Sequence, residues 1–529
     1  MMVTLLDYGA GNVRSIRNAI RKLGYDVKDV SSPKDVENAS KLIFPGVGSF
    51  GNAMKTLYQS GYVEALRRYV ENGKPFFGIC LGLQTLFEGS EESPGVPGLG
   101  VIKGYVRRFD DHSVSIPHIG WNGIKLWKAS RLFSGYIGEK LYFVHSYRPV
   151  PDRSESEWIL TTTDYGGEFV SGVQKGNVVA VQFHPEKSGS AGLQILKNFL
   201  ESDNMLFAEA RYQVSSRKTR LTKRIVACLD VRTDDEGNLV VTKGHRYDVR
   251  EKGEVRRLGE PVELAKIYFE EGADEICFLN ITGFRNFPLK DMPMLEVLRK
   301  TSENVFVPLT IGGGIRDYVD SDGRKYSSLD VASEYFRSGA DKVSIGSEAV
   351  YDAEKLITTG EKTGENSIEQ ISEVYGRQAV VVSIDPRRVY VQSPNSVRHH
   401  TIKTTQLGPN GEEYCWYQCT VKGGREGRDI DAFQMAKACE KLGAGEILLN
   451  CIDRDGTNLG YDTELIRDIT HAVGIPVIAS SGAGCAEHFY DVFTRTGAEA
   501  ALAAGIFHRK ETSVQAVKNH LRKRGIEVR

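Results

Sequence analysis

A cysteine, a histidine and a glutamate in the first 190 residues have the types and spacing of a nucleophilic site. Cys80 stands in the glycine-flanked run 78–82 (GICLG), and His184 and Glu186 belong to the run 183–186 (FHPE). A thiol becomes a nucleophile when a base takes its proton, and a third group must orient that base. We therefore predict that Cys80 attacks a carbonyl carbon, with His184 as the base and Glu186 as the orienting group.

The residues around Cys80 predict how the thiol is presented. Residues 74–79 (KPFFGI) are typical of a buried strand, and residues 84–87 are expected to continue as a helix. A strand-to-helix elbow exposes the side chain at its apex and directs backbone N–H groups at a developing oxyanion. An isolated cysteine in an apolar strand is more often a core residue. The pairing of this elbow with the distant FHPE run favours the nucleophile.

Hydrophobic spacing divides the chain into domains. Val13, Ile16, Ile20 and Leu23 recur at helical spacing, and Gly24 is expected to end that helix. Strand-like and helix-like patterns alternate over residues 1–202, which predicts an α/β fold with an open, mostly parallel sheet. Residues 203–222 are polar and are typical of a linker, with a basic patch as the alternative. Residues 223–529 are expected to form the second domain.

The second domain contains an internal duplication. Four segments of its first half each match a segment of its second half: 228–230 with 383–385, 272–280 with 443–450, 310–315 with 479–484, and 339–346 with 497–505. Each half supplies four short apolar strands separated by helical segments. Four strands plus four predict a (β/α)8 TIM barrel with quasi-twofold symmetry.

Two aspartates are expected at the rim of this barrel. Asp230 and Asp385 occupy equivalent positions at the ends of the first strand of each half. Reactive groups of such barrels lie where strands end. Two carboxylates facing each other across the mouth suit general acid/base catalysis, with their pKa values set apart by environment. The alternative for either residue alone is a helix N-cap.

Glycine clusters mark two further parts of the rim. Without a Cβ, the backbone N–H groups at a strand end can approach phosphate oxygens closely. Two such clusters on opposite sides of one mouth predict an elongated substrate with a phosphate at each end. The first cluster contains Gly313, Gly314, Gly346 and Ser347, and the second contains Gly482, Gly484 and Gly505.

Four charged residues lie near the starts of barrel strands, on the face opposite the chemistry. They are Arg224, Glu275, Lys342 and Glu446. Two positive and two negative groups could pair as a closed ring, although an ordinary solvated rim is the alternative.

Composition excludes several classes of protein. Of the 529 residues, 40% are hydrophobic and 26% are charged, as in globular proteins, and 68 Lys and Arg balance 69 Asp and Glu. This balance predicts no nucleic-acid or anionic-membrane partner, and no apolar run is long enough for a membrane span. The eight cysteines show no metal-ligand spacing and are expected to be reduced. No metal or other cofactor is predicted.

Residues 1 to about 200 resemble the class I glutamine amidotransferases. The resemblance rests on the elbow and FHPE runs and on residues 44–48, 118–122 and 142–147. It implies that Cys80, His184 and Glu186 form a catalytic triad that hydrolyses L-glutamine to glutamate and ammonia. It also implies that backbone groups near Gly48 and Leu81 hold the oxyanion, and that Gln84, Ser146 and Tyr147 hold glutamine.

The barrel resembles the phosphoribosyl-processing barrels of histidine biosynthesis, and specifically the cyclase half of the imidazole glycerol phosphate synthase family. The matching runs are 227–231, 242–244, 383–385 and 452–457. The resemblance implies that Asp230 and Asp385 are the general acid/base pair, with Lys243 on a flexible loop near the substrate and Asp455 in support. It further implies that Arg224, Glu275, Lys342 and Glu446 gate ammonia into the barrel.

The implied reaction converts phosphoribulosyl-formimino-AICAR phosphate to imidazole glycerol phosphate and AICAR. The order glutaminase then cyclase resembles the single-chain form of fungi and plants. The chain departs from the bacterial pattern at Asn280, where a carboxylate is common, at Gly505, where a hydroxyl residue is common, and in extra loops at 318–328 and 389–415.

Two alternatives remain open at this point. A glutaminase–barrel pair of the pyridoxal phosphate synthase kind would need imine-forming lysines in the barrel, and an inactive glutamine-binding sensor module would not need the triad. Both functional domains lie in one chain, which is expected to be a monomer. The chain begins directly with a strand pattern, which predicts a cytoplasmic protein, or a plastid stromal one after removal of a transit peptide.

Overall fold

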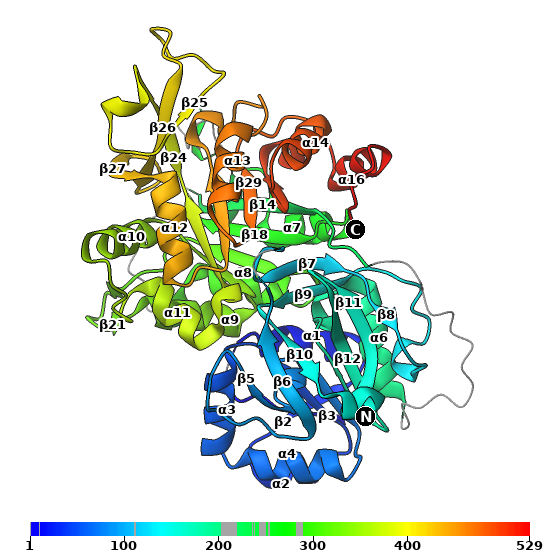
Figure 1. The fold of residues 1–529 in the computed structure, drawn as a ribbon. Helices are drawn as coiled ribbons and strands as arrows, with labels where there is room; N and C mark the ends of the chain where they lie inside the picture. The colour runs from blue at the N-terminus through cyan, green and yellow to red at the C-terminus, as the bar shows by residue number, and fades with distance from the viewer. Residues whose placement is uncertain are drawn as a thin grey trace.

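The computed structural model describes residues 2–9, 11–110, 113–202, 219–234, 236, 238–242, 250–251, 254–255, 257–281 and 289–529. The chain folds into two bodies that pack directly on each other (Figure 1). The N-terminal body, blue to cyan in the figure, lies against one end of the C-terminal body, which runs from green to red.

A mixed eight-stranded sheet forms the centre of the N-terminal body. The first five strands in the spatial order are parallel to one another, and each of the last three is antiparallel to the strand before it. In spatial order the strands are β2 (Asp26–Asp29), β1 (Met2–Leu5), β3 (Leu42–Gly46), β4 (Phe76–Cys80), β13 (Val178–Val181), β12 (Glu168–Lys175), β11 (Ile159–Asp164) and β8 (Lys125–Leu126).

Helices cover both faces of this sheet, because its central strands are apolar on both sides. On β4, Phe76 belongs to the core beneath α3 and α4, whereas Phe77 belongs to the core beneath α1 and α6. This confirms the predicted α/β fold. The helices are α1 (Val13–Lys22), α2 (Pro33–Glu37), α3 (Phe50–Gln59), α4 (Tyr62–Glu71), α5 (Leu81–Gln84) and α6 (Gly189–Glu201).

The helix predicted from the spacing of apolar residues is α1, and Gly24 follows it with a φ of 87°. The helix predicted over residues 84–87 is wrong. The helix α5 ends at Gln84, and Phe87 begins strand β5 (Phe87–Ser90). This strand pairs with β6 (Ile102–Arg108), which pairs in turn with β10 (Tyr147–Pro151). Strands β7 (His118–Asn122) and β9 (Leu141–His145) form a separate pair.

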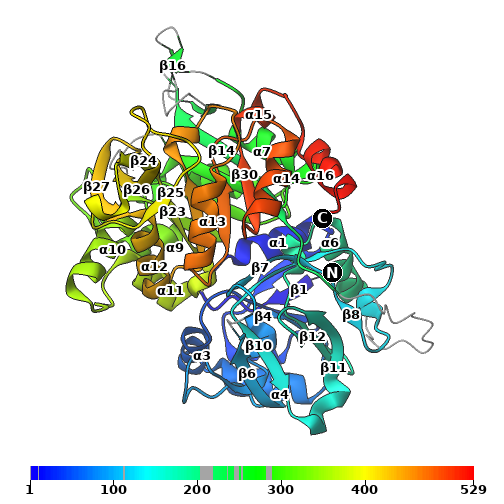
Figure 2. The same cartoon turned by 45° about the horizontal axis from the view of Figure 1, so that its top comes forward.

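The C-terminal body is a closed barrel of eight parallel strands, as the duplication predicts (Figure 2). The first strand, β14, pairs with the last, β30, and closes the barrel. The strands are β14 (Arg224–Thr233), β18 (Glu275–Asn280), β19 (Leu309–Gly312), β22 (Lys342–Ile345), β23 (Val380–Ile384), β28 (Glu446–Asn450), β29 (Val477–Ser480) and β30 (Ala500–Ala503).

Ten helices of the described residues belong to the barrel domain. They are α7 (Pro261–Glu270), α8 (Pro293–Thr301), α9 (Ser328–Ser338), α10 (Ser347–Thr359), α11 (Ser367–Tyr375), α12 (Ala432–Leu442), α13 (Thr463–Ala472), α14 (Ala486–Arg495), α15 (Gly505–His508) and α16 (Val514–Lys523). Their apolar faces and the outward side chains of the strands form one continuous core. A separate apolar cluster lies inside the barrel and includes Val226, Cys277, Leu448 and Leu502.

Short strands are added to the eight strands of the barrel. Strand β15 (Leu239–Thr242) runs antiparallel to β14. Two small pairs follow, β16 (Arg250–Glu251) with β17 (Glu254–Val255), and β20 (Tyr318–Val319) with β21 (Lys325–Tyr326). The fifth barrel strand leads into a sheet of four strands: β24 (Pro386–Val391), β25 (Thr401–Lys403), β26 (Tyr414–Val421) and β27 (Glu426–Asp431). The predicted extra loops therefore contain β-structure.

Direct hydrogen bonds join the two bodies. The side-chain amide of Asn12 donates to the carbonyl of Gly339 at 2.9 Å, and the indole N–H of Trp121 donates to the carbonyl of Asp274 at 3.1 Å. The backbone N–H of Ile116 donates to the carbonyl of Gly474 at 2.8 Å. The N-terminal body thus contacts the barrel at the end where the strands begin.

Candidate active sites

Cys80 lies at a strained elbow between β4 and α5. Its backbone has a φ of 52° and a ψ of −101°, which a residue with a Cβ rarely adopts. The turn closes because Gly82 packs against β3. A Cβ at Gly82 would lie 2.2 Å from the carbonyl oxygen of Phe44. The elbow therefore fixes the direction of the thiol, although the cysteine is only 8% exposed.

His184 and Glu186 meet beside this thiol. The Nδ1 atom of His184 lies 2.8 Å from Oε1 of Glu186, and both side chains are buried. Burial alone would lower the pKa of His184, but the negative charges of Glu186 and of the Cys80 thiolate raise it well above its ordinary value. The arrangement favours a protonated imidazole at His184.

Two glutamine side chains extend this site. The side-chain amide of Gln182 donates to the Cys80 sulfur at 3.3 Å, and that of Gln84 donates to the carbonyl of Tyr147 at 3.1 Å. Ser146 has a buried hydroxyl without a hydrogen-bond partner in the described part of the chain, so it is open to a ligand. The sequence patterns did not indicate a role for Gln182.

A small cavity of about 40 Å³ lies next to Cys80. The predicted residues Gly48, Leu81, Gln84, Ser146 and Tyr147 all line it, together with Glu92. The opposite wall belongs to the barrel and consists of Asp341, Gln378 and Ala379. The pocket beside Cys80 is therefore completed by the second domain.

Glu92 is a pocket residue that sequence reasoning missed. One of its carboxylate oxygens accepts a hydrogen bond from the backbone N–H of Phe50 at 2.8 Å. Burial raises the pKa of Glu92 to about 7. A carboxyl group held at this wall suits recognition of a cationic ligand group.

The four charged residues predicted at the strand starts form a closed ring. Each is the first residue of its strand: Arg224 of β14, Glu275 of β18, Lys342 of β22 and Glu446 of β28. Lys342 Nζ lies 2.7 Å from Glu275 and 2.6 Å from Glu446, and Arg224 pairs with both glutamates, at 2.9 Å with Glu275.

Water is excluded from this ring, because all four side chains are at most 1% exposed. Against the effect of burial, Arg224 and Lys342 lower the pKa of Glu446. The hydroxyl of Thr310 donates a further hydrogen bond to Glu275 at 2.6 Å. The ring thus fills the base of the barrel, just outside the apolar interior.

Tyr142 lies between the Cys80 pocket and the ring. It comes from β9 and lines the pocket, and its ring centroid lies 6.5 Å from that of His184. Burial and the Glu275 carboxylate raise the pKa of Tyr142 well above its ordinary value. Beside it, Lys187 Nζ forms an ion pair with Asp341 at 2.7 Å. The sequence predicted neither the effect of Glu275 on Tyr142 nor the Lys187–Asp341 ion pair, because each joins residues of different domains.

The barrel mouth holds a much larger cavity of about 620 Å³. Asp230, Asp385 and Asp455 all line it. Asp385 directly follows β23, as predicted. Asp230 does not end its strand, because pairing with β15 extends β14 to Thr233.

Asp385 is held by two donors. The side-chain amide of Asn450 donates to it at 2.8 Å and the hydroxyl of Ser383 at 3.1 Å. Despite these hydrogen bonds, burial and the nearby Asp455 carboxylate raise the pKa of Asp385. A raised pKa suits a group that must both give and take a proton.

The two glycine clusters lie at the same mouth. Gly313, Gly314, Gly346 and Ser347 line one part of the cavity, and Gly482 and Gly505 line another. Gly484 does not line it; a Cβ there would lie 2.4 Å from the carbonyl oxygen of Asn458, so its role is close packing. Lys243 lies outside the described residues.

Basic residues accompany the clusters and were missed by sequence reasoning. Arg316, Lys422 and Arg425 line the cavity that contains the first cluster, and Arg509 lines it together with Gly505. A Cβ at Gly505 would lie 2.6 Å from the Arg509 guanidinium. Absence of a side chain at Gly505 therefore leaves room for an arginine, at a position where the bacterial pattern commonly has a hydroxyl residue.

Comparison with known proteins places these two sites together in one family. The profile of the family described as "Glutamine amidotransferase class-I" matches residues 4–202, and that described as "Histidine biosynthesis protein" matches residues 224–513. "Imidazole glycerol phosphate synthase hisHF, chloroplastic" of Arabidopsis thaliana is 60% identical over all of this chain and 89% of its own length. The chain belongs to the imidazole glycerol phosphate synthase family.

Further relatives agree with this family assignment. "Imidazole glycerol phosphate synthase hisHF" of Schizosaccharomyces pombe is 55% identical over 98% of each chain. The separate "Imidazole glycerol phosphate synthase subunit HisF" of Methanosphaera stadtmanae is 42% identical over 58% of this chain and 99% of its own. The single-chain members of the family thus join two parts, of which the second exists elsewhere as a subunit. Among the described residues, no helix is long and apolar enough to cross a membrane.

Proposed function

We propose that this chain is a bifunctional imidazole glycerol phosphate synthase. It hydrolyses L-glutamine to glutamate and ammonia and passes the ammonia through the barrel. At the mouth, phosphoribulosyl-formimino-AICAR phosphate becomes imidazole glycerol phosphate and AICAR. The observation that carries the proposal is that the cysteine–histidine–glutamate site opens against the starting end of a barrel whose other end holds Asp230 and Asp385.

Glutamine hydrolysis follows from the contacts of Cys80. The thiolate attacks the amide carbon of glutamine, and the protonated His184 gives its proton to the departing ammonia. Glu186 holds the imidazole in the orientation that this transfer needs. Backbone N–H groups near Gly48 and Leu81 stabilise the oxyanion, and water then releases glutamate from the thioester.

Glutamine is held by the polar groups of the small cavity. The carboxylate of Glu92 binds the α-ammonium group, and Gln84, Ser146 and Tyr147 bind the remaining polar atoms. Ammonia leaves past Tyr142 and reaches the ring of Arg224, Glu275, Lys342 and Glu446, which opens as a gate. The apolar interior beyond the ring then keeps bulk water away from the ammonia, so that the ammonia is not protonated.

Ring closure takes place at the mouth. Asp230 and Asp385 exchange protons with the substrate during ammonia addition and bond cleavage, supported by Asp455. Glycine clusters and the neighbouring arginines bind the two phosphates. The family resemblance adds Lys243 to the residues that bind the substrate. Among the described residues of the cavity, the single lysine is Lys422, on a turn and not on a strand, which gives the pyridoxal phosphate synthase alternative no support.

The experiment that tests this division of labour is Cys80→Ala, assayed with glutamine and with ammonium salts. Loss of the glutamine-dependent activity alone is expected. Cys485→Ala, which removes the exposed cysteine, is the matched control and should keep both activities. Loss of both activities in Cys80→Ala, in a folded protein, would contradict the proposal.

For partners and compartment we propose a monomer that acts on small molecules without a metal or other cofactor. The chloroplastic name of the Arabidopsis relative favours the plastid stroma over the cytoplasm. Import into isolated plastids of the full-length precursor tests this location.

A further inference from the structure

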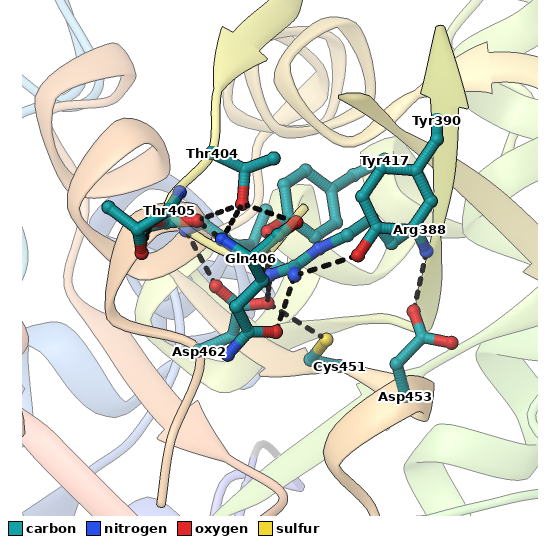
Figure 3. A network of polar contacts seen from close by, with 11 residues as sticks. Arg388, Tyr390, Thr404, Thr405, Gln406, Tyr417, Cys451, Asp453 and Asp462 are labelled. Atoms are coloured by element: carbon teal, nitrogen blue, oxygen red, sulfur yellow. Dashed lines mark hydrogen bonds and ion pairs between the residues drawn. The ribbon is translucent and has the colours of Figure 1, made fainter. Parts of the chain in front are cut away.

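Of the sheet inserted after β23, only the turn between β26 and β27, with Lys422 and Arg425, has entered the function described so far. It begins at Pro386, directly after Asp385, and its strands β24 and β26 pair over six residues. A polar network joins this sheet to the loop between β28 and α13, which contains Asp455 (Figure 3). The network therefore connects two segments that carry carboxylates of the barrel mouth.

Arg388 is the centre of this network. Its side chain is only 5% exposed, and its guanidinium donates to the Tyr390 hydroxyl at 3.4 Å and, at shorter distances, to three other groups. These are Oδ2 of Asp462 at 2.5 Å, the hydroxyl of Tyr417 at 2.8 Å and the side-chain oxygen of Gln406 at 2.6 Å. Arg388 lies outside the lining of the mouth, so it does not contact the substrate there.

Asp462 is the hydrogen-bond acceptor of the network on the barrel side. Besides Arg388, its Oδ2 accepts hydrogen bonds from the Tyr417 hydroxyl at 2.9 Å and from the Cys451 thiol at 3.4 Å. Burial and the Asp462 carboxylate raise the pKa of Cys451, so the sulfur keeps its proton and acts as the donor. The other oxygen of Asp462 caps α13 by accepting from the N–H of Leu465 at 3.2 Å.

A second arm of the network uses the backbone. The N–H of Arg388 donates to Oδ2 of Asp453 at 2.6 Å. Asp453 belongs to the short 3-10 helix Ile452–Arg454, which is followed directly by Asp455. Cys451 precedes this helix, so the network holds the segment both before and within the helix (Figure 3).

We propose that Arg388 is a positioning residue for the cyclase reaction. Through Asp462, Cys451 and Asp453 it fixes the segment carrying Asp455 relative to the strand end carrying Asp385. The inference rests on the proposed function, because it concerns the geometry of that reaction. Misplacement of a reacting group by about 1 Å can cost on the order of a hundredfold in rate.

The test measures ammonia-dependent cyclisation by the full chain at saturating ammonium chloride. Arg388→Lys keeps the charge but cannot donate to Asp462, Tyr417 and Gln406 in one plane. We expect its kcat to fall by roughly 10- to 100-fold, while the KM for the phosphorylated substrate changes less than about threefold. The pH profile of kcat should also shift, because Asp385 loses its fixed environment. Arg387→Ala, one residue away on the exposed side, is the matched control and should leave kcat unchanged.

Tyr417→Phe provides a milder variant should Arg388→Lys fold poorly. It removes one hydroxyl from the network and should lower kcat by about threefold, and combined with Asp462→Asn its effect should be non-additive. Arg388→Lys with a wild-type kcat would overturn the inference. So would variants whose kcat and unfolding temperature fall in parallel without a change in the pH profile, since that result indicates anchoring alone. A wild-type chain without cyclase activity would instead overturn the proposed function.

Discussion

The two cavities of this chain differ in size and in the residues that line them. The cavity at Cys80 measures about 40 Å³ and its reactive groups are already in mutual contact. The cavity at the barrel mouth measures about 620 Å³ and is lined by residues from strand ends all around the barrel. A small substrate can be gripped by a preformed pocket, whereas an elongated one with two phosphates needs an open mouth.

The two cavities also differ in what holds their functional side chains in position. At Cys80, precision comes from backbone strain and close glycine packing at the elbow. At the mouth it comes from donors to Asp385 and from the Arg388 network behind it. The buried ring lies between them and belongs to neither cavity.

The largest expected effect is a loss of the activity of the small pocket alone. Glu186→Gln removes the charge that raises the pKa of His184, so the imidazole loses the carboxylate that keeps it protonated and oriented. Glutamine-dependent turnover should fall by roughly 10⁴-fold, as for a buried carboxylate behind a catalytic histidine. Ammonia-dependent turnover should stay near wild type, and a loss of both would show that the cavities are not separable.

The next largest effect is a loss of the cyclisation activity at the barrel mouth alone. Asp385→Asn keeps the shape of the side chain but cannot exchange a proton, so cyclisation should fall by roughly 10³-fold with either nitrogen source. Basal glutamate release, measured without the phosphorylated substrate, should persist. Asp429→Asn, on the exposed surface of the inserted sheet, is the control. Equal cyclisation by Asp385→Asn and wild type would remove Asp385 from the mechanism.

The ring is tested by the ratio of glutamate formed to product formed. Lys342→Ala leaves Glu275 and Glu446 with one cation fewer, which should destabilise the fold by about 3–5 kcal/mol. In the remaining folded enzyme, ammonia should escape and the ratio should rise several-fold above that of wild type. Lys355→Ala on the exposed face of α10 controls for loss of a lysine. A ratio unchanged in Lys342→Ala would contradict the gate.

The smallest effect concerns Glu92 and pH. Its pKa of about 7 lies above its ordinary value of 4.5, so this group contributes stability that is complete below pH 4.5 and is lost as the pH rises to about 7. Binding of an α-ammonium group needs the carboxylate, so kcat/KM for glutamine should rise with pH up to about 7.

Glu92→Gln should abolish both pH dependences and raise KM for glutamine by roughly tenfold. Steady-state kinetics and thermal unfolding on both sides of neutral pH measure them, with the exposed Glu71→Gln as control. A Glu92→Gln profile that still follows the wild-type curve would assign the titration to another group.

Much of the fold could be predicted, because it depends on the local spacing of apolar residues and on repeated segments of the sequence. Apolar spacing indicates α1, and the repeated strand segments indicate the eight-stranded barrel. The prediction of a helix over residues 84–87 was wrong, because pairing of Phe87 with Ile102 in β5 and β6 overrides the local preference. The same limit applies to Asp230, whose strand is extended by β15.

The site could be predicted only in part, since its remaining members meet through tertiary contacts. Cys80, His184 and Glu186 stand in short recognisable runs. No local pattern indicates that Asp341 of the barrel pairs with Lys187, or that Arg388 reaches Asp462. Both pairs join residues that lie far apart in the chain, by 74 positions for Arg388 and Asp462.

The barrel wall of the glutaminase pocket has a consequence for inhibitor design. Asp341, Gln378 and Ala379 would face any compound bound at Cys80. Because Cys80, His184 and Glu186 all lie in the first domain, the thiol itself offers little discrimination among glutaminases that have the same three residues. A compound that reacts with Cys80 and also extends toward Gln378 would draw its selectivity from the synthase domain.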